Sequence, residues 1–293
     1  MTIISYNHGR LSNQLFGMSH FLAFAIKNNL KIQCPSFVPY APYFELRKPT
    51  LACPDQIKVG SAALRLLLKF SLPLLRKRPI SRYYTFQEIL PYGQPIPLEN
   101  LNLINQPNSP RYNILTGWGY SFFPGFIEYQ DTLRKFFSPK EHIKQNYEKL
   151  IKRLKSEDSL LVGIHIRKGD YKKWRNGKYF YEDYVYLRIM KEIMFQIKST
   201  YGLSTKFLIC SDATIDKNFQ NEFDVSFGLG KSIEDLFSLS LCDLLIGPPS
   251  TYSLWASFYG KVPIVHIKSQ NNPISLDNFC QPWQKPEWYN NNL

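Results

Sequence analysis

The chain has 293 residues, of which 44% are hydrophobic, so it can bury one large core or two domains of about 100–200 residues each. Its formal net charge of +13 would suit nucleic acid, anionic lipid or an anionic substrate, but no nucleic-acid-binding module accompanies the charge. The histidines are scattered and no Asp-x-Asp pair occurs. These two features argue against a zinc site and against a divalent cation held by paired carboxylates.

Five cysteines, an odd number, include no Cys-x-x-Cys pair, and no signal peptide precedes the first predicted strand. We therefore expect free thiols and a cytoplasmic location. The Asn- and Pro-rich end of the chain contains Trp283 and Trp288, which we expect to fold back onto the body of the protein.

The first predicted element is a short strand at residues 3–6, followed by a polar turn that begins at Gly9 and then by a helical pattern. This order places backbone N–H groups and a helix N-terminus against an anion. Asn13 and Gln14 add side-chain amides at the start of the helix. The alternative is that Ser12 or Asn13 only caps the helix.

Residues 61–82 interleave leucines with six basic side chains, which are Arg65, Lys69, Arg76, Lys77, Arg78 and Arg82. The segment is too short and too charged to span a bilayer. One interpretation is a basic amphipathic helix that lies peripherally on an anionic inner membrane. The other is an ordinary helix on the surface of a domain, and in either case we expect Pro73 to interrupt it.

Residues 91–112 are rich in proline and asparagine and are expected to form a loop before a strand at 113–117. A basic amphipathic helix is expected at 139–156, where it would connect the two halves of the chain. From residue 159 onward, predicted strands alternate with predicted helices, which favours a parallel, doubly wound sheet. These elements lie at residues 160–166, 183–200, 206–211, 232–241, 243–247, 252–259 and 262–267.

The run from His165 to Asp170 directly follows an apolar stretch, at the strand end where ligands bind in open α/β sheets. Arg167 offers a planar fork of donors that suits phosphate, and Lys168 adds a second cation. Asp170 and His165 supply an acid/base or orienting group. The alternative is a solvated charged loop after a core strand.

A second polar loop joins the predicted strand 243–247 to the helix 252–259. Ser250, Thr251 and Ser253 lie where this helix starts, and their hydroxyl groups can converge on a phosphate together with backbone donors. As the alternative, they serve only as caps.

Two rival enzyme motifs fail. Gly230-Lys231-Ser232 matches the end of a phosphate-binding P-loop, but Val225 occupies the position of the required glycine. The sequence has no Gly-x-Ser-x-Gly elbow of a hydrolase. Hydrolysis of a nucleoside triphosphate and serine hydrolase chemistry are therefore disfavoured.

The chain resembles the inverting α-1,2-fucosyltransferases (glycosyltransferase family 11), within the superfamily that also includes the α-1,6- and protein O-fucosyltransferases. Four motifs in family order carry the resemblance. They are the Gly-x-x-Gly-Asn-Gln start at residues 9–16, the His-x-Arg-Arg-x-Asp run at 165–170, the strand that ends in Ser-Asp at 211–212, and the Asp-Leu, Cys-Asp and Ser-Thr segments between 235 and 255.

Four positions depart from the family pattern. Ser12 replaces a glycine, Lys168 the second arginine, Pro249 an asparagine and Leu254 the first tryptophan. Lysine keeps the charge at 168 but loses the bidentate fork. Proline removes an amide side chain and a backbone donor from its loop. These departures concern the choice of substrate more than membership of the superfamily.

The resemblance implies an α/β, GT-B-like fold of two Rossmann-type halves with parallel sheets. An N-terminal acceptor-side domain would cover residues 1–156, and a C-terminal domain that binds the GDP-sugar would cover 157–293. The implied activity is transfer of L-fucose from GDP-β-L-fucose to a hydroxyl, O2 of a galactoside, with inversion, as in galactoside 2-α-L-fucosyltransferases of O-antigen or polysaccharide biosynthesis.

The same resemblance implies the roles of the site residues. The catalytic set comprises Arg167, Asp170, His165 and Asn13. The set that binds the donor comprises Arg167, Lys168, Asp212, Ser250, Thr251, Ser253, Gln14 and Gly9. Asp212 is expected to pair with the two-donor edge of guanine, or alternatively to cap the helix that follows. Glu182 is a further candidate for the general base, and no cofactor or metal is expected.

Two alternatives to fucosyl transfer stay open. The protein could transfer another sugar from a GDP donor, or it could be a non-catalytic protein of the same fold that binds sugar or a membrane surface. The expected partners are GDP-fucose, a galactose-containing acceptor and, through residues 61–82, an anionic membrane. Nucleic acid is not expected as a partner.

Overall fold

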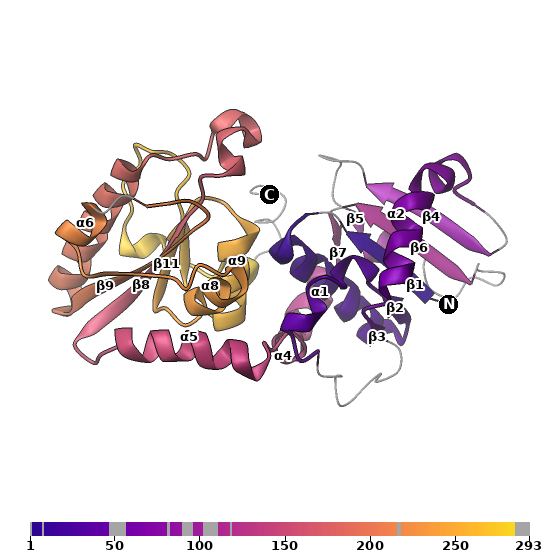
Figure 1. Cartoon of the computed structure of the whole chain (residues 1–293), viewed down its shortest axis with the longest axis horizontal. Helices are drawn as coiled ribbons and strands as arrows, with labels where there is room; N and C mark the ends of the chain where they lie inside the picture. Colours follow the sequence, from indigo (N-terminus) through magenta and orange to yellow (C-terminus); the bar gives the residue numbers. More distant parts are fainter. Residues whose placement is uncertain are drawn as a thin grey trace. The chain divides into compact units, whose positions relative to one another are not determined.

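The computed structural model describes residues 2–7, 9–46, 57–80, 83–89, 96–101, 111–117, 119–215 and 218–284. The chain forms two compact units, Met1–Lys140 and Glu141–Leu293, and each contains a parallel β-sheet with helices packed on it (Figure 1). This confirms the expected α/β fold with parallel sheets.

The sheet of the first unit has the strand order β3-β2-β1-β6-β4, and neighbouring strands pair in parallel. Its strands are β1 (Thr2–Asn7), β2 (Lys31–Gln33), β3 (Ile57–Lys58), β4 (Tyr84–Ile89) and β6 (Tyr112–Gly117). A small second sheet pairs β5 (Ile96–Pro97) with β7 (Tyr120–Ser121). The helices are α1 (Leu11–Asn28), α2 (Ala62–Lys77), α3 (Phe123–Glu128) and α4 (Gln130–Phe136).

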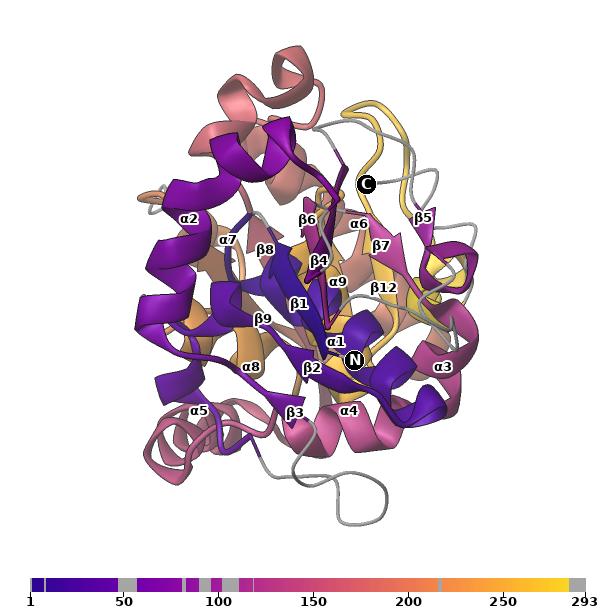
Figure 2. The same cartoon turned by 90° about the vertical axis from the view of Figure 1, so that its right-hand side faces the viewer.

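Alternation along β1 explains how this unit packs. Ile4 and Tyr6 point to one face of the sheet, where they share an apolar cluster with Leu68, Leu72 and Leu75 of α2. Figure 2 shows α2 along this side of β1, β6 and β4. Helix α1 buries a largely apolar run of side chains against β1, β2 and β7.

The predicted interruption of the helix in residues 61–82 is wrong, because α2 runs without a break through Pro73. Pro73 lies on the exposed side of the helix. Water can therefore hydrate the Lys69 carbonyl, which loses its helical partner to the proline ring.

The second unit has the strand order β10-β9-β8-β11-β12, again parallel throughout, and differs from the first unit only in the order of its last two strands. Its strands are β8 (Ser159–Ile166), β9 (Ser204–Ser211), β10 (Val225–Phe227), β11 (Leu244–Gly247) and β12 (Ile264–His266). Its helices are α5 (Glu141–Leu154), α6 (Asp183–Tyr201), α7 (Asn218–Glu222), α8 (Ser232–Leu239) and α9 (Thr251–Gly260). In each unit, the first strand of the unit lies in the middle of its sheet.

Strand β8 shows why the apolar run at 160–166 becomes a buried central strand. Val162, Ile164 and Ile166 pack in one cluster with the apolar side chains of α6. The intervening residues point to the opposite face, where Gly163 lies against Leu239 of α8. Because both faces of the sheet are covered, β8 does not alternate between apolar and polar residues.

Helix α5 belongs to the second unit. The Tyr147 ring stacks on Phe237 of α8 with ring centroids 5.6 Å apart, and Asn146 Nδ2 donates a hydrogen bond to Glu234 Oε1 at 2.7 Å. The division between the units therefore falls at residues 140/141, before this helix, whereas the sequence placed it at 156/157.

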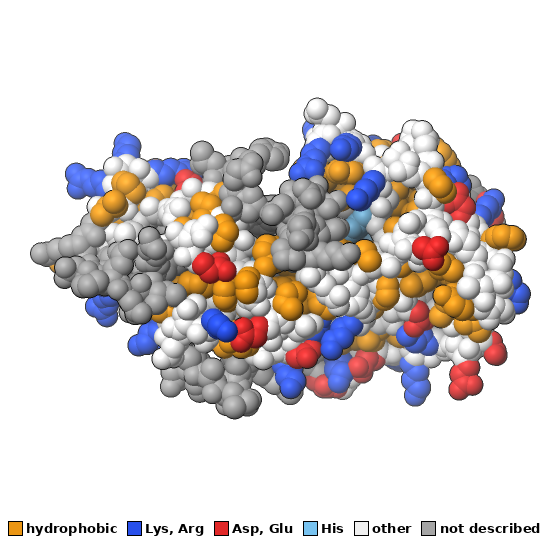
Figure 3. Space-filling model, turned by 180° about the vertical axis from the view of Figure 1, so that it is seen from behind, with side chains coloured by type: hydrophobic (Ala, Val, Ile, Leu, Met, Phe, Trp, Pro, Cys, Tyr) orange, Lys and Arg blue, Asp and Glu red, His pale blue; other side chains and the backbone are white. Residues whose placement is uncertain are grey.

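Trp283 is buried against Phe258, with ring centroids 5.5 Å apart, whereas Trp288 lies outside the described residues. The described cysteines carry free thiols, and Cys53 lies outside the description. On the face shown in Figure 3, Lys and Arg side chains are scattered among other side chains and form no continuous band.

Candidate active site

The carboxyl end of β8 is the place in the second unit where the fold favours a ligand. β8 pairs with β9 on one side and with β11 on the other. The connection that follows β8 leads to β9 and the one that follows β11 leads to β12, so the two run to opposite sides of the sheet. In open α/β sheets the crevice at such a switch point binds ligands. The charged run from His165 to Asp170 begins here.

Arg167 is held between two carboxylates. Its Nε and Nη2 donate to the two oxygens of Asp170 at 2.9 and 3.0 Å, and Nε lies 3.3 Å from Asp212 Oδ2. Burial acts to lower the pKa of Arg167, but the hydrogen bonds and charge of Asp170, and then the charge of Asp212, raise it above the usual value. The guanidinium is fixed in place, and Nη1 takes no part in the pair of bonds with Asp170.

Asp212 connects the loop after β8 to the end of β9. Its Oδ1 accepts hydrogen bonds from the backbone N–H groups of Lys168 at 2.8 Å and Gly169 at 3.3 Å. A Cβ at residue 169 would lie 2.9 Å from Asp212 Oδ2, which explains the glycine there. Asp212 thus shapes the loop that carries Arg167, and the helix that it was expected to cap, α7, begins only at Asn218.

The ammonium of Lys168 points to the start of α6. Its Nζ lies 2.5 Å from Asp183 Oδ1 and 3.6 Å from Glu182 Oε2. Lys168 was expected as a second phosphate ligand and Glu182 as a candidate base. In the structure these two side chains form an ion pair, and Asp183 adds a second carboxylate. The charge of Lys168 is therefore already balanced by carboxylates.

His165 is buried on the side of β8 that faces α9. Its ring lies 4.9 Å from the Tyr252 ring, centroid to centroid, and its Nδ1 has no hydrogen-bond partner among the described residues. Burial, reinforced by the charge of Arg167, lowers the pKa of His165 to about 3. A ring held neutral in this way is suited to hydrogen bonding and poorly suited to taking up a proton.

The loop before α9 lies on the other side of the switch point. Ser250 Oγ caps the helix by accepting from Tyr252 N at 3.2 Å, and Tyr171 Oη donates to the Pro249 carbonyl at 2.6 Å. Ser253 is fully buried, and its Oγ donates to the Ser250 carbonyl at 3.3 Å. The capping alternative is thus correct for Ser250, while half-buried Thr251 remains at the helix start.

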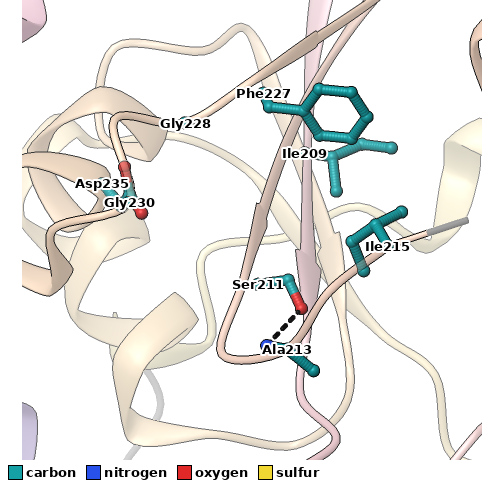
Figure 4. A pocket seen from close by; sticks show the side chains of 8 residues that line it. All are labelled: Ile209, Ser211, Ala213, Ile215, Phe227, Gly228, Gly230 and Asp235. Atoms are coloured by element: carbon teal, nitrogen blue, oxygen red, sulfur yellow. Dashed lines mark hydrogen bonds between the residues drawn. The ribbon is translucent and has the colours of Figure 1, made fainter. Parts of the chain in front are cut away.

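A pocket of about 260 Å³ lies beside the ends of β9 and β10. In Figure 4, Ile209, Ile215 and Phe227 form its apolar side, and the carboxylate of Asp235 lies at the other end, next to Gly228. The volume is below the roughly 300–1,000 Å³ of complete small-molecule sites. It therefore fits one part of a larger ligand, such as a planar ring.

Asp235 is the buried acid of this pocket. Its Oδ1 accepts from Leu229 N at 2.6 Å. Burial raises the pKa of Asp235 to about 6, although backbone hydrogen bonds from Leu229 and Gly230 oppose the shift. Sequence reasoning cited Asp235 only as part of a motif and missed its place in a pocket. The available signal was an acid within the apolar face of a predicted helix.

In the first unit, the predicted polar turn lies at the carboxyl end of the central strand β1. Gly9 has φ +95°, and a Cβ there would lie 2.2 Å from Asn13 Nδ2. Gln14 Nε2 donates to the Gly9 carbonyl at 3.3 Å. Arg10 is the N-cap residue of α1 and makes no side-chain cap bond, so the idea that Ser12 or Asn13 caps this helix is wrong.

Among the residues that the structure describes, no cluster of His, Cys, Asp or Glu side chains could hold a metal ion. The donors that face the switch point are a guanidinium, backbone amides and hydroxyl groups. This set is suited to oxyanions such as phosphate.

Comparison with known proteins gives the family. The sequence model of Glycosyl transferase family 11 matches residues 75–292. The chain belongs to this family. The match contains the motifs at 165–170, 211–212 and 235–255, while the turn at Gly9 lies outside it. A comparison with curated proteins found no match.

Solved structures with the same fold include three fucosyltransferases. Arabidopsis thaliana FUT1, a mutant in complex with GDP, has a TM-score of 0.60 at 12% identity, over 95% of this chain and 72% of that one. NodZ α-1,6-fucosyltransferase soaked with GDP-fucose has 0.57 at 12%, over 95% and 96%, and a NodZ structure from Bradyrhizobium has 0.55 at 13%, over 94% and 96%. POFUT1 with GDP-fucose has 0.51 at 13%, over 89% and 94%. These likenesses show the GT-B-like fold.

Because burial lowers the pKa of both His165 and His266 from 6.5 to about 3, we expect both rings to stay neutral in the folded protein between about pH 5 and 8. The unfolded chain takes up protons on these rings below pH 6.5, so stability should fall as the pH drops from 6.5 toward 3. NMR titration of the ring signals, assigned with His165→Gln, checks this. A His165 signal that titrates near pH 6 would contradict it.

Proposed function

We propose that this protein transfers L-fucose from GDP-β-L-fucose to O2 of a galactoside, with inversion at the anomeric carbon. Membership of glycosyl transferase family 11 supports glycosyl transfer. Among the structures of similar fold, FUT1 was solved in complex with GDP, POFUT1 in complex with GDP-fucose and NodZ after soaking with GDP-fucose. The observation that carries the proposal is the guanidinium of Arg167, fixed by Asp170 and Asp212 at the carboxyl end of β8.

The reaction breaks the bond between the anomeric carbon and the β-phosphate oxygen of the donor, while the acceptor hydroxyl attacks from the opposite face and gives up its proton to the departing diphosphate. Negative charge grows on the departing diphosphate, and fixed donors stabilise this charge best where water is excluded. Nη1 of Arg167 is free of the bonds with Asp170 and supplies two N–H donors. The backbone N–H groups at the start of α9 add donors of the same kind.

We assign Asp170 an orienting role rather than that of general base, because both of its oxygens bind Arg167. His165 is buried and its low pKa keeps it neutral, so it is suited to a hydrogen bond with the donor. Asn13 and Gln14 lie in the corresponding turn of the first unit, and their role in binding the donor stays a prediction from the sequence. Gly9 permits the tight turn before them.

We also propose that the guanine of the donor occupies the pocket lined by Phe227 and Asp235. A carboxylate accepts from the N1–H and exocyclic amine of guanine, whereas adenine presents an acceptor at that edge. Asp235 lines the pocket directly, whereas Asp212 is not among the residues that line it. This differs from the expectation that Asp212 reads the base, and the two assignments make opposite predictions.

The activity itself is tested with purified protein, GDP-fucose and a panel of galactosides, with the products examined by mass spectrometry, linkage analysis and NMR. We expect one fucose, α-linked, on O2 of galactose. Binding of GDP without turnover across the panel would favour a non-catalytic protein. Turnover with a different GDP-sugar, and none with GDP-fucose, would favour the other alternative.

Replacing Arg167 by alanine should lower the transfer rate by two or three decades, since a charged donor at such a site contributes roughly 2–4 kcal/mol to transition-state stabilisation. Steady-state kinetics of the folded variant measure the loss. Arg188→Ala on α6 is the matched control, because this arginine is also paired with an acid, Glu192. Near-normal turnover of Arg167→Ala would refute the assignment.

Asp235→Asn should abolish the preference for GDP over ADP, while Asp212→Asn should weaken both nucleotides alike by loosening the loop that carries Arg167. Calorimetric titration gives the affinities. Since the pKa of Asp235 is raised to about 6, GDP should bind more tightly to the wild-type protein as the pH rises through 6, and Asp235→Asn should lose this dependence. Loss of base preference in Asp212→Asn alone would support the original expectation for that residue.

Transfer should persist after exhaustive chelation, because the proposed phosphate ligands are fixed side-chain and backbone donors and none requires a bridging cation. The measurement is the initial rate in excess chelator, with added magnesium or manganese as the comparison. A complete loss of activity that either ion restores would contradict the metal-free mechanism.

A further inference from the structure

Helix α2 has two apolar sides, and the sheet covers only one of them. Leu68, Leu72 and Leu75 are buried in the cluster with Ile4 and Tyr6 of β1. This inward side accounts for the attachment of α2 to the first unit. The leucines and the phenylalanine on the other side have no role in that packing.

The outward side forms a continuous apolar stripe. Leu67, Phe70 and Leu74 are spaced by three and four residues, so they lie along one side of the helix. Their exposed fractions are 62%, 76% and 60%. Leu66, on the same helix, is 49% exposed. Scattered apolar side chains are ordinary on a protein surface, but a contiguous group marks an interaction site.

The surroundings of this stripe are basic. Lys69, Lys77 and Arg78 are exposed, and residues 57–80 contain no aspartate or glutamate. Arg76 pairs with Glu88 of β4 at 2.7 Å. The stripe is thus bordered by cations, and this fits an anionic surface with an apolar interior behind it.

We propose that α2 is a membrane-contacting element, which lies flat in the interface of an anionic bilayer with Leu67, Phe70 and Leu74 inserted among the acyl chains. At 1.5 Å per residue its 16 residues extend about 24 Å along the surface. Lys69 and Lys77 contact the lipid phosphates, as in basic amphipathic helices at interfaces. Among the described residues, no helix is apolar and long enough to cross a membrane.

Charge favours lipid over a second copy of the chain as the occupant of this surface. Two copies that met through the stripe would bring two sets of basic side chains together without acids between them, and like charges in contact oppose association. An anionic bilayer satisfies the apolar and the basic parts of the surface at once.

The test is co-sedimentation of the full chain with vesicles of phosphatidylcholine alone and with vesicles that also contain phosphatidylglycerol. We expect binding only to the anionic vesicles, and weaker binding at high salt. The triple variant Leu67→Ser/Phe70→Ser/Leu74→Ser should bind more than tenfold more weakly, and Lys69→Gln/Lys77→Gln about tenfold more weakly. Because these side chains are exposed, thermal unfolding should be unchanged.

Matched controls distinguish the stripe from surface chemistry in general. Phe195→Ser on α6 removes an exposed phenylalanine, 72% exposed, and Lys149→Gln/Lys152→Gln removes two exposed lysines of α5. Both controls should bind like the wild-type protein. Failure of the wild-type chain to bind anionic vesicles, equal binding to neutral ones, or normal binding by the triple variant overturns the proposal. A dimer in light scattering that the triple variant abolishes, without vesicle binding, would assign the stripe to self-association.

Discussion

A half-buried arginine needs partners, and the way in which Arg167 is partnered determines the chemistry of the whole candidate site. Asp170 fixes the guanidinium through two parallel bonds, and Asp212 approaches from β9. Two carboxylates carry more charge than one guanidinium, but one oxygen of Asp212 accepts hydrogen bonds from two backbone N–H groups of the same loop. Charge-assisted bonds of this kind are short and directional. The result is a guanidinium with a fixed orientation and donors left for an anion.

The topology explains why this arrangement occurs at that place. In both units the first strand lies in the middle of a parallel sheet, so its carboxyl end opens onto the switch point. In the second unit β8 delivers Arg167, β9 delivers Asp212 and the loop after β11 delivers Ser250. In the first unit β1 delivers the turn at Gly9. Within the second unit, residues far apart in the sequence therefore reach one sheet edge through short loops.

The sequence was sufficient for the strands and helices with a strong apolar signal. The strand predicted at 160–166 and the helix predicted at 183–200 are found as β8 and α6, because each has a regular pattern of buried apolar side chains. Strand β10, Val225–Phe227, was missed because three half-exposed or exposed residues give no periodicity. Strands β2 and β3 were missed because two or three residues are too few to show an alternating pattern.

At the site, the sequence indicated which loops matter but not which partner each side chain takes. The pairing of Lys168 with Asp183 depends on where α6 begins in space. Likewise, the place of Asp235 in the pocket depends on how the loop after β10 folds over α8. Ser250 and Ser253 are three residues apart, yet one caps α9 and the other is buried against its own helix. Such distinctions arise from tertiary contacts, which no local pattern encodes.

The central claim is that Asp170 acts on the nucleotide only through Arg167. A double-mutant cycle of GDP binding with Arg167→Ala and Asp170→Asn, measured by calorimetry, tests it most directly. We expect Asp170→Asn to weaken GDP binding in the wild-type background and to have almost no effect once Arg167 is alanine. Independent, additive losses in the two backgrounds would contradict it.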